Sequence, residues 1–276
     1  MEKNMNVVIY GVQVRRLIDG PGPEGSLKHY AEMGITGVDT LESELKELSF
    51  DEYNKYITDA GMSYNAFVAL SDIVTAKGKE LEKNYATVKG HIDELSRLGV
   101  PKIMLAPMVI PAESREEFHA MRERMVESFG AMVEYARGSG VQVTIENQSV
   151  PQRADSYIKD CKYILDQIPD LGFVFDTGNF YCVMDDVLAA WDVLGSRSVH
   201  CHAKDWEYDD YGRIIRSYLP PMSSAVMGQG LLPLDKLFAK MKADGYDGAI
   251  NLEVNGRPYT TELLDKSAEY LLSICK

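Results

Sequence analysis

The chain has 276 residues, of which 45% are hydrophobic and 26% are charged, a composition typical of globular proteins. Its 42 acidic residues outnumber its 29 lysines and arginines, and the net charge of −13 disfavours nucleic-acid and anionic-membrane binding. Four scattered cysteines do not suggest a disulfide scaffold, and neither a signal-peptide pattern nor a long apolar run is present. We therefore expect a cytoplasmic protein that binds neither nucleic acid nor membranes.

Eight short apolar runs recur along the chain, and most are separated by amphipathic stretches that predict helices. Several of these stretches end in glycine, which closes a helix in the left-handed conformation, just before the next run. The repeat predicts a single-domain (β/α)₈ TIM barrel over residues 1–276. A doubly wound open sheet is disfavoured because no G-x-G-x-x-G follows the first run. The predicted strands are 6–14, 35–41, 62–70, 102–108, 141–148, 171–179, 198–205 and 248–254.

The longest connection without a helical pattern runs from Trp206 to Gly230. It is rich in aromatic residues, contains Pro220 and Pro221, and directly follows the seventh predicted strand. Long connections in compact domains often act as lids or binding loops. We predict that this one covers the mouth of the barrel and sets substrate choice.

Polar residues end the last four predicted strands, on the face that should point into the barrel. In SVHCHAKD, His200 and His202 share one face because side chains alternate along a strand. The same alternation turns the acids of VQVTIE, GFVFD and INLE inward, each at the carboxyl end of its strand. The residues predicted to ring the mouth are Glu146, Asp176, His202 and Glu253.

Three converging carboxylates repel one another unless a cation lies between them. Each acid also has a simpler interpretation, since Asp176 could cap the next helix and Glu253 could pair with Arg257. Four such residues at equivalent depths on consecutive strands favour a metal site. Carboxylates with an imidazole suit one divalent ion, and we expect Mn²⁺ in preference to Mg²⁺, Co²⁺ or Zn²⁺.

The whole chain resembles the sugar phosphate isomerase/epimerase family of xylose isomerase-like TIM barrels. The resembling segments are TIEN, VFDTGN, HCHAKD, and GQG followed by LDKLFAKMKADGYDGAINLE. The family's metal ligands fall on Glu146, Asp176, His202 and Glu253. The chain departs from the family at Asn179 and Gln148, where many members carry histidine, which leaves the substrate and the reaction open.

The resemblance implies proton abstraction next to a carbonyl through a metal-stabilised enediolate, with Glu146 and Glu253 as catalytic bases on opposite faces of the substrate. It implies a small-molecule sugar partner, and a homo-oligomer, dimer or tetramer, is compatible with the sequence. Several candidate substrate-binding residues also have structural interpretations: His200 could fill the barrel, Lys204 could pair with Asp205, and Trp206 could pack the loop. The candidate substrate-binding residues are Gln148, Asn179, His200, Lys204, Trp206 and Arg257.

Four functions compete for this pattern. The first is a divalent-metal-dependent isomerase or epimerase of a keto-sugar or sugar phosphate. An inosose dehydratase-like lyase would share the ligands and the first deprotonation and then expel a hydroxyl group. An endonuclease IV-like repair enzyme would need more histidines and a basic face, which five histidines and the net charge disfavour. A binding protein on a decayed barrel is disfavoured by the intact set of ligands.

Overall fold

Eight parallel strands close into a barrel in the computed structural model, which describes residues 5–212, 214–216, 218–255 and 258–275. Neighbours around the barrel follow the order of the chain, and the last barrel strand, β11, pairs with β1 to close the ring. This confirms the predicted TIM barrel. The barrel strands are β1 (Asn6–Tyr10), β2 (Gly37–Leu41), β3 (Ser63–Ala69), β4 (Lys102–Leu105), β5 (Gln142–Glu146), β6 (Gly172–Asp176), β7 (Ser198–Ala203) and β11 (Ala249–Leu252).

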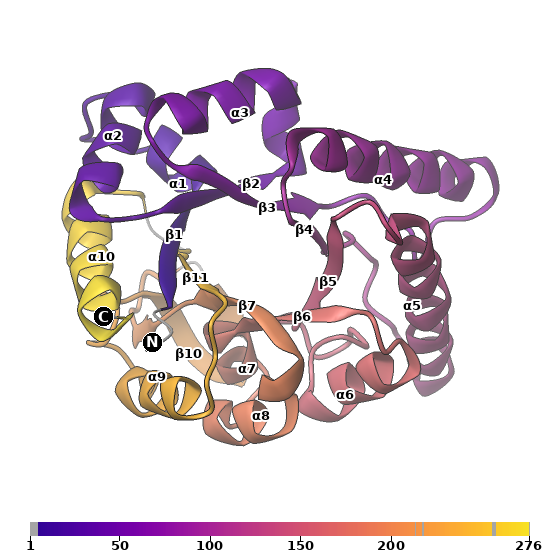
Figure 1. The fold of residues 1–276 in the computed structure, drawn as a ribbon. Coiled ribbons are helices and arrows are strands. Elements are labelled where there is room, and N and C mark those ends of the chain that lie inside the picture. The colour runs from indigo at the N-terminus through magenta and orange to yellow at the C-terminus, as the bar shows by residue number, and fades with distance from the viewer. Residues whose placement is uncertain (1–4, 213, 217, 256–257, 276) are drawn as a thin grey trace.

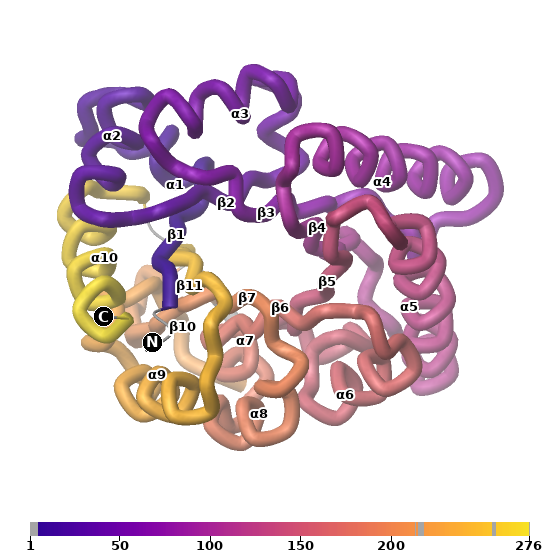
Figure 2. The backbone as a smooth tube through the Cα atoms, in the orientation of Figure 1, coloured from indigo at the N-terminus to yellow at the C-terminus, as the bar shows by residue number. Residues whose placement is uncertain are grey.

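Helices surround the barrel on its outside (Figure 1). The chain passes around the ring once, so that the last helix, α10, packs beside β1 (Figure 2). None of the described helices combines the length and apolar character that a membrane crossing requires. The helices are α1 (Gly11–Arg15), α2 (Pro23–Met33), η1 (Glu42–Lys46), α3 (Phe50–Asp59), α4 (Gly78–Leu98), α5 (Arg115–Ala136), α6 (Ile158–Gln167), α7 (Thr177–Cys182), α8 (Val187–Leu194), η2 (Gly195–Arg197), α9 (Leu234–Ala243) and α10 (Thr261–Cys275).

The strands divide their side chains between two hydrophobic cores, as alternation predicts. Outward residues such as Ile145, Phe173 and Phe175 join the large core between barrel and helices. A smaller, separate core fills the barrel interior. It consists of Tyr10, Val12, Val68, Met104 and Val174, with Leu41, Leu70 and Ala106 packed against it.

Most of the predicted strands end earlier than expected, and at two of them a helix begins at once. The run 6–14 leaves the sheet after Tyr10, and its second half forms α1. The run 171–179 ends at Asp176, whose Oδ1 accepts a hydrogen bond from the backbone N–H of Asn179 at 2.8 Å and caps α7. Continuous apolar composition hid the first boundary, because an apolar run fits a buried strand and a buried helical turn equally well.

The segment expected to be a loop forms a small antiparallel sheet. Its strands are β8 (Trp206–Tyr208), β9 (Ile214–Arg216) and β10 (Leu219–Ser224), with β10 in the centre. Proline is rare in a central strand because it has no N–H to donate. Here the pairing register shifts between Leu219 and Met222, so Pro220 and Pro221 lie at the irregularity. Because of these two prolines, the sequence predicted a loop where the structure has strand β10.

Candidate metal centre

Four ligand-type side chains meet at the carboxyl ends of neighbouring strands. Glu146, Asp176 and His202 belong to β5, β6 and β7, and Glu253 directly follows β11. One nitrogen or carboxylate oxygen from each of the four lies within 4.8 Å of the others. The alternation of side chains along each strand brings these residues together, because the strands are parallel and end at the same face of the barrel.

Lys204 and His202 supply positive charge to this cluster. The Lys204 Nζ lies 2.6 Å from Asp176 Oδ2 and 2.9 Å from Glu253 Oε1. The His202 Nδ1 lies 2.5 Å from Glu146 Oε1 and 3.2 Å from Glu253 Oε2. These contacts link all five side chains into one network at the mouth of the barrel.

These contacts shift the ionisation of the cluster. Burial raises the pKa of Asp176 to about 8, because the Lys204 ammonium offsets only part of its desolvation. Burial also opposes ionisation of Glu253, but Lys204 and His202 outweigh it and hold its pKa at about 2. The carboxylates around His202, Glu146 foremost, outweigh its desolvation and raise its pKa well above the usual range.

The residues present fit a divalent cation. Asp176 Oδ2 and Glu253 Oε2 are buried, with the Lys204 ammonium at 2.6 Å from the first and His202 Nδ1 at 3.2 Å from the second. A carboxylate oxygen has two lone pairs, so each oxygen can also bind a cation. Carboxylate oxygens and an imidazole nitrogen are donors that Mn²⁺, Mg²⁺ and Zn²⁺ accept. The helix-cap interpretation of Asp176 is also correct, but it uses only the other oxygen.

A second buried network lies one layer deeper in the barrel and contains Asp39, a residue that the sequence did not single out. Asp39 Oδ2 lies 2.6 Å from His200 Nε2 and 3.6 Å from His202 Nε2. Its other oxygen accepts a hydrogen bond from Asn65 Nδ2 at 2.6 Å. The two histidines hold the pKa of Asp39 below its usual range despite burial. The sequence feature that could have revealed Asp39 is an acidic residue within the predicted strand segment GVDTL.

The prediction that His200 and His202 both point into the barrel is confirmed, since both side chains are buried there. His200 Nδ1 lies 3.0 Å from the Ala249 carbonyl oxygen, and burial lowers the pKa of His200. Its partners are thus Asp39 and the backbone, and contact between His200 and substrate stays a prediction.

A cavity of about 320 Å³ opens above the cluster. Glu146 and Glu253 line it, together with four of the predicted substrate-binding residues. Arg257, the other rim residue named from sequence, lies outside the described residues. The lining residues are Tyr10, Leu41, Val68, Leu70, Met104, Ala106, Met108, Glu146, Gln148, Ser149, Arg153, Asn179, Cys182, Lys204, Trp206, Ile214, Glu253 and Asn255.

Three of the predicted substrate-binding residues are held by hydrogen bonds. Gln148 Nε2 donates to Glu146 Oε2 at 3.0 Å, and Asn179 Nδ2 donates to the Asn147 carbonyl at 2.9 Å. The indole N–H of Trp206 donates to the Gly178 carbonyl at 2.9 Å. Each of these side chains thus has a fixed position in the cavity wall.

Asp205 does not pair with Lys204, so that structural interpretation is wrong. Asp205 instead accepts hydrogen bonds from the backbone N–H groups of Gly228, Gly230 and Leu232. These bonds tie the segment that follows β10 to the end of β7. The Lys204 ammonium pairs instead with Asp176 and Glu253.

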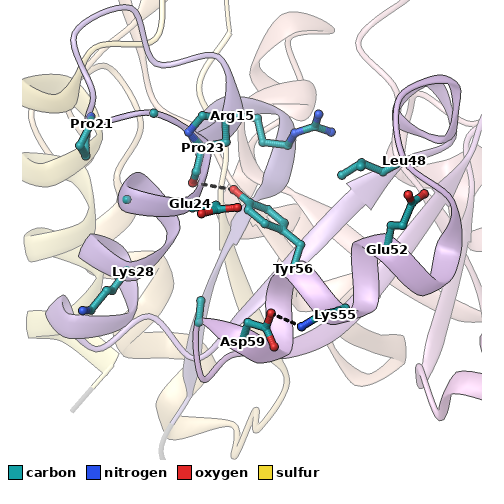
Figure 3. Close-up of a pocket in the computed structure, with 13 residues that line it drawn as sticks. Arg15, Pro21, Pro23, Glu24, Lys28, Leu48, Glu52, Lys55, Tyr56 and Asp59 are labelled. Carbon is teal, nitrogen blue, oxygen red and sulfur yellow. Dashed lines mark hydrogen bonds and ion pairs between the residues drawn. The ribbon is translucent and has the colours of Figure 1, made fainter.

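A larger cavity of about 810 Å³ lies between α2 and α3 (Figure 3). It shares no lining residue with the cavity at the mouth. Two polar contacts join residues of its wall, since Lys55 Nζ lies 2.5 Å from Asp59 and the Tyr56 hydroxyl donates to the Pro23 carbonyl at 2.6 Å, and neither candidate metal-ligand group contains one of its lining residues. We therefore place the functional site at the mouth of the barrel.

Comparison with known proteins agrees with this architecture. Residues 27–274 match the family model described as xylose isomerase-like TIM barrel. An inosose isomerase of Halalkalibacterium halodurans is 22% identical over 252 residues, which cover 90% of this chain and 84% of the relative.

Solved structures of similar fold include a D-psicose 3-epimerase with D-tagatose from Clostridium cellulolyticum H10 (TM-score 0.74, 16% identity, 98% of both chains). An IOLI protein with a bound zinc atom is also similar (TM-score 0.73, 17% identity, 98% of this chain and 95% of that one). The chain also matches 42% of a longer xylose isomerase-like TIM barrel/4-hydroxyphenylpyruvate dioxygenase fusion protein, with 98% of its own length covered (TM-score 0.75, 19% identity).

Proposed function

We propose, from the premise that this chain belongs to the xylose isomerase-like TIM barrel family, that it is a divalent-metal-dependent isomerase or epimerase of a keto-sugar or sugar phosphate. The observation that carries the proposal is the convergence of one ligand atom each from Glu146, Asp176, His202 and Glu253 within 4.8 Å. The names of the inosose isomerase and the psicose epimerase are compatible with this class.

When bound to the four ligands, a divalent cation such as Mn²⁺ would supply positive charge beside the carbonyl and hydroxyl oxygens of the substrate. Such charge makes the hydrogen on the carbon next to the carbonyl more acidic. A carboxylate can then remove that proton, although it is a weak base.

Glu146 and Glu253 are the proposed bases. They come from strands separated by β6 and β7, and both line the cavity. Each is held by an amide two residues further along the chain: Gln148 Nε2 donates to Glu146 at 3.0 Å, and Asn255 Nδ2 donates to Glu253 at 2.8 Å. One carboxylate removes the proton from one face of the substrate, and the other returns a proton to the opposite face, which inverts the carbon.

The remaining wall residues would orient the substrate. Asn179 and Gln148 offer amide groups to its hydroxyl oxygens, in place of the histidines of related enzymes. Trp206 gives an apolar surface, because its indole N–H is already bonded to Gly178. Lys204 would interact with the negatively charged intermediate.

A dehydratase is the second candidate, and the position of Lys204 favours it. Its ammonium lies within 3 Å of both Asp176 and Glu253 and lines the cavity, so it holds a proton beside the site of deprotonation. Donation of that proton to a departing hydroxyl group would complete the loss of water. The first step would be shared with the isomerase.

Turnover in deuterated water tests the proposal. Protein loaded with Mn²⁺ is incubated with a panel of keto-sugars and sugar phosphates, with chelator-treated protein as the control. We expect isomer formation with deuterium on the carbon next to the carbonyl, only in the loaded sample. Deuterium incorporation with water loss would identify the dehydratase, and metal-dependent turnover of a keto-sugar without deuterium would contradict both.

A further inference from the structure

The cavity at the mouth has two chemically different walls. Strands β5, β6, β7 and β11 and the segments that follow them supply the metal ligands and several amide groups. The opposite side carries six apolar side chains, which we call the apolar wall, and Tyr10 of β1 lies between the two sides. The six side chains come from β2, β3 and β4 and the residues directly after them: Leu41, Val68, Leu70, Met104, Ala106 and Met108.

The apolar wall is a continuous surface. Leu41 pairs in register with Val68, and Val68 pairs with Met104, so these three residues lie at one level of the barrel. Val68 and Met104 belong to the hydrophobic core inside the barrel, and Leu41, Leu70 and Ala106 pack against that core. Met108 carries the surface outward to the rim, where its side chain is 71% exposed, and Ile110 beyond it is 74% exposed.

A fully hydroxylated sugar would fit this wall poorly. Hydroxyl groups that face aliphatic side chains lose their hydrogen bonds to water and gain none in return. The polar side of the cavity can satisfy hydroxyl groups through Gln148, Asn179 and Asn255, but the apolar wall offers them no side-chain partner.

A phosphate group would also lack a free cation among the described lining residues. Arg153 is buried, bonds Asp155 through Nε at 2.9 Å and Nη2 at 2.7 Å, and donates from Nη1 to the Pro107 carbonyl. Lys204 is paired with Asp176 and Glu253. Both cationic side chains are therefore already paired with acids of this chain.

We propose that the substrate is an unphosphorylated α-hydroxyketone, such as a keto-sugar, that carries an alkyl or aryl group on the side facing the apolar wall. The inference rests on the proposed function, because it assumes that the hydroxyketone oxygens face the metal ligands. The cavity of about 320 Å³ holds the reacting part, and the exposed rim at Met108 lets the apolar group extend outward.

Hydroxamates test the inference by calorimetry, because they chelate metal ions as an α-hydroxyketone does and differ only in the attached group. Four probes are titrated into Mn²⁺-loaded and metal-free protein: acetohydroxamate, benzohydroxamate, threonohydroxamate and phosphoglycolohydroxamate. We expect metal-dependent binding of acetohydroxamate and at least about tenfold tighter binding of benzohydroxamate, from burial of the ring. The polyol and phosphate probes should bind more weakly than benzohydroxamate.

Two variants locate the effect on the apolar wall. Val68→Thr and Met104→Gln introduce polar atoms at nearly constant volume and should reduce the gain of benzohydroxamate over acetohydroxamate to about threefold or less. Val193→Thr and Met184→Gln are matched controls at exposed positions outside the cavity and should keep the full gain. Unchanged metal content and acetohydroxamate affinity show that each variant is folded. If only one of the two wall variants folds, that variant alone is sufficient for the test.

The outcomes separate this inference from the proposed function. Acetohydroxamate binding that depends on metal, combined with preference for the polyol or phosphate probe, overturns the inference and leaves the proposed function intact. A gain that persists in both wall variants also overturns it. Acetohydroxamate binding that is absent, or equal with and without metal, contradicts the proposed function and the inference together.

Discussion

Glu42 and Asp176 show how the two halves of the barrel treat a carboxylate at the end of a strand. Glu42 directly follows β2 and accepts hydrogen bonds from Ser71 N at 2.9 Å, Ser71 Oγ at 2.7 Å and the backbone N–H of Leu70, with His91 Nε2 at 3.2 Å. Asp176 ends β6, and its Oδ2 has the Lys204 ammonium at 2.6 Å as its partner. The first carboxylate is held by neutral donors and a histidine of the protein, whereas the second lies in the cluster with Glu146, His202 and Glu253.

The two halves of the barrel also contribute different kinds of side chain to the cavity at the mouth. The half built from β2 to β4 gives aliphatic side chains to the cavity, and the half built from β5 to β11 gives acids, amides and Lys204. We infer that reaction chemistry is confined to the second half. The first half shapes the substrate cavity and maintains the fold.

The largest effect should come from Glu253→Gln, in the second half. The amide keeps an oxygen for the metal but cannot transfer a proton, so turnover should fall by about 10²–10⁴-fold while metal content is retained. Steady-state kinetics and elemental analysis measure the two quantities. Glu42→Gln is the matched control and should keep turnover near wild type. Equal turnover of Glu253→Gln and wild type would remove Glu253 from the mechanism.

Asp39→Asn tests a carboxylate of the first half that lies close to His202, one of the proposed metal ligands. Asp39 lies 3.6 Å from His202 Nε2, on the side of the ring opposite Nδ1, and can orient the imidazole. Loss of its charge should weaken metal affinity by about 10–100-fold, measured by competition with a fluorescent chelator. Reduced stability with unchanged metal affinity would assign Asp39 a purely structural role.

Glu42→Gln should give the smallest effect, on stability. Hydrogen bonds hold the pKa of Glu42 at about 2, below its ordinary 4.5, despite burial. The carboxylate therefore stabilises the folded state fully above pH 4.5, and this contribution is lost as the pH falls toward 2. We expect a loss of about 1–2 kcal/mol in the free energy of unfolding at pH 7, discounted for partial exposure. Urea unfolding at several pH values should show the difference shrinking in acid, and a pH-independent difference would contradict this role.

The barrel and the inward direction of the four proposed ligands followed from local patterns in the sequence. Alternation along a strand fixes the face of a side chain, and parallel strands bring their carboxyl ends to one rim. Glu146, Asp176, His202 and Glu253 could therefore be placed together from their strands alone.

Features that depend on contacts between distant strands were not predictable in this way. Asp39 meets His200 only because β1 and β11 close the ring between β2 and β7. The apolar wall depends equally on the register between β2, β3 and β4. The sheet of β8 to β10 was missed for a local reason, since Pro220 and Pro221 are typical of a loop and lie here at a register shift.

Metal stoichiometry gives the most direct test of the division between the two halves. Wild-type protein is stripped with chelator, reconstituted with Mn²⁺, separated from free ion and measured by elemental analysis beside Asp176→Ala, His202→Ala and Glu42→Ala. We predict one ion per chain in wild type and in Glu42→Ala, and loss of the ion in the other two variants. Full metal content in both Asp176→Ala and His202→Ala would contradict a metal centre at the mouth of the barrel.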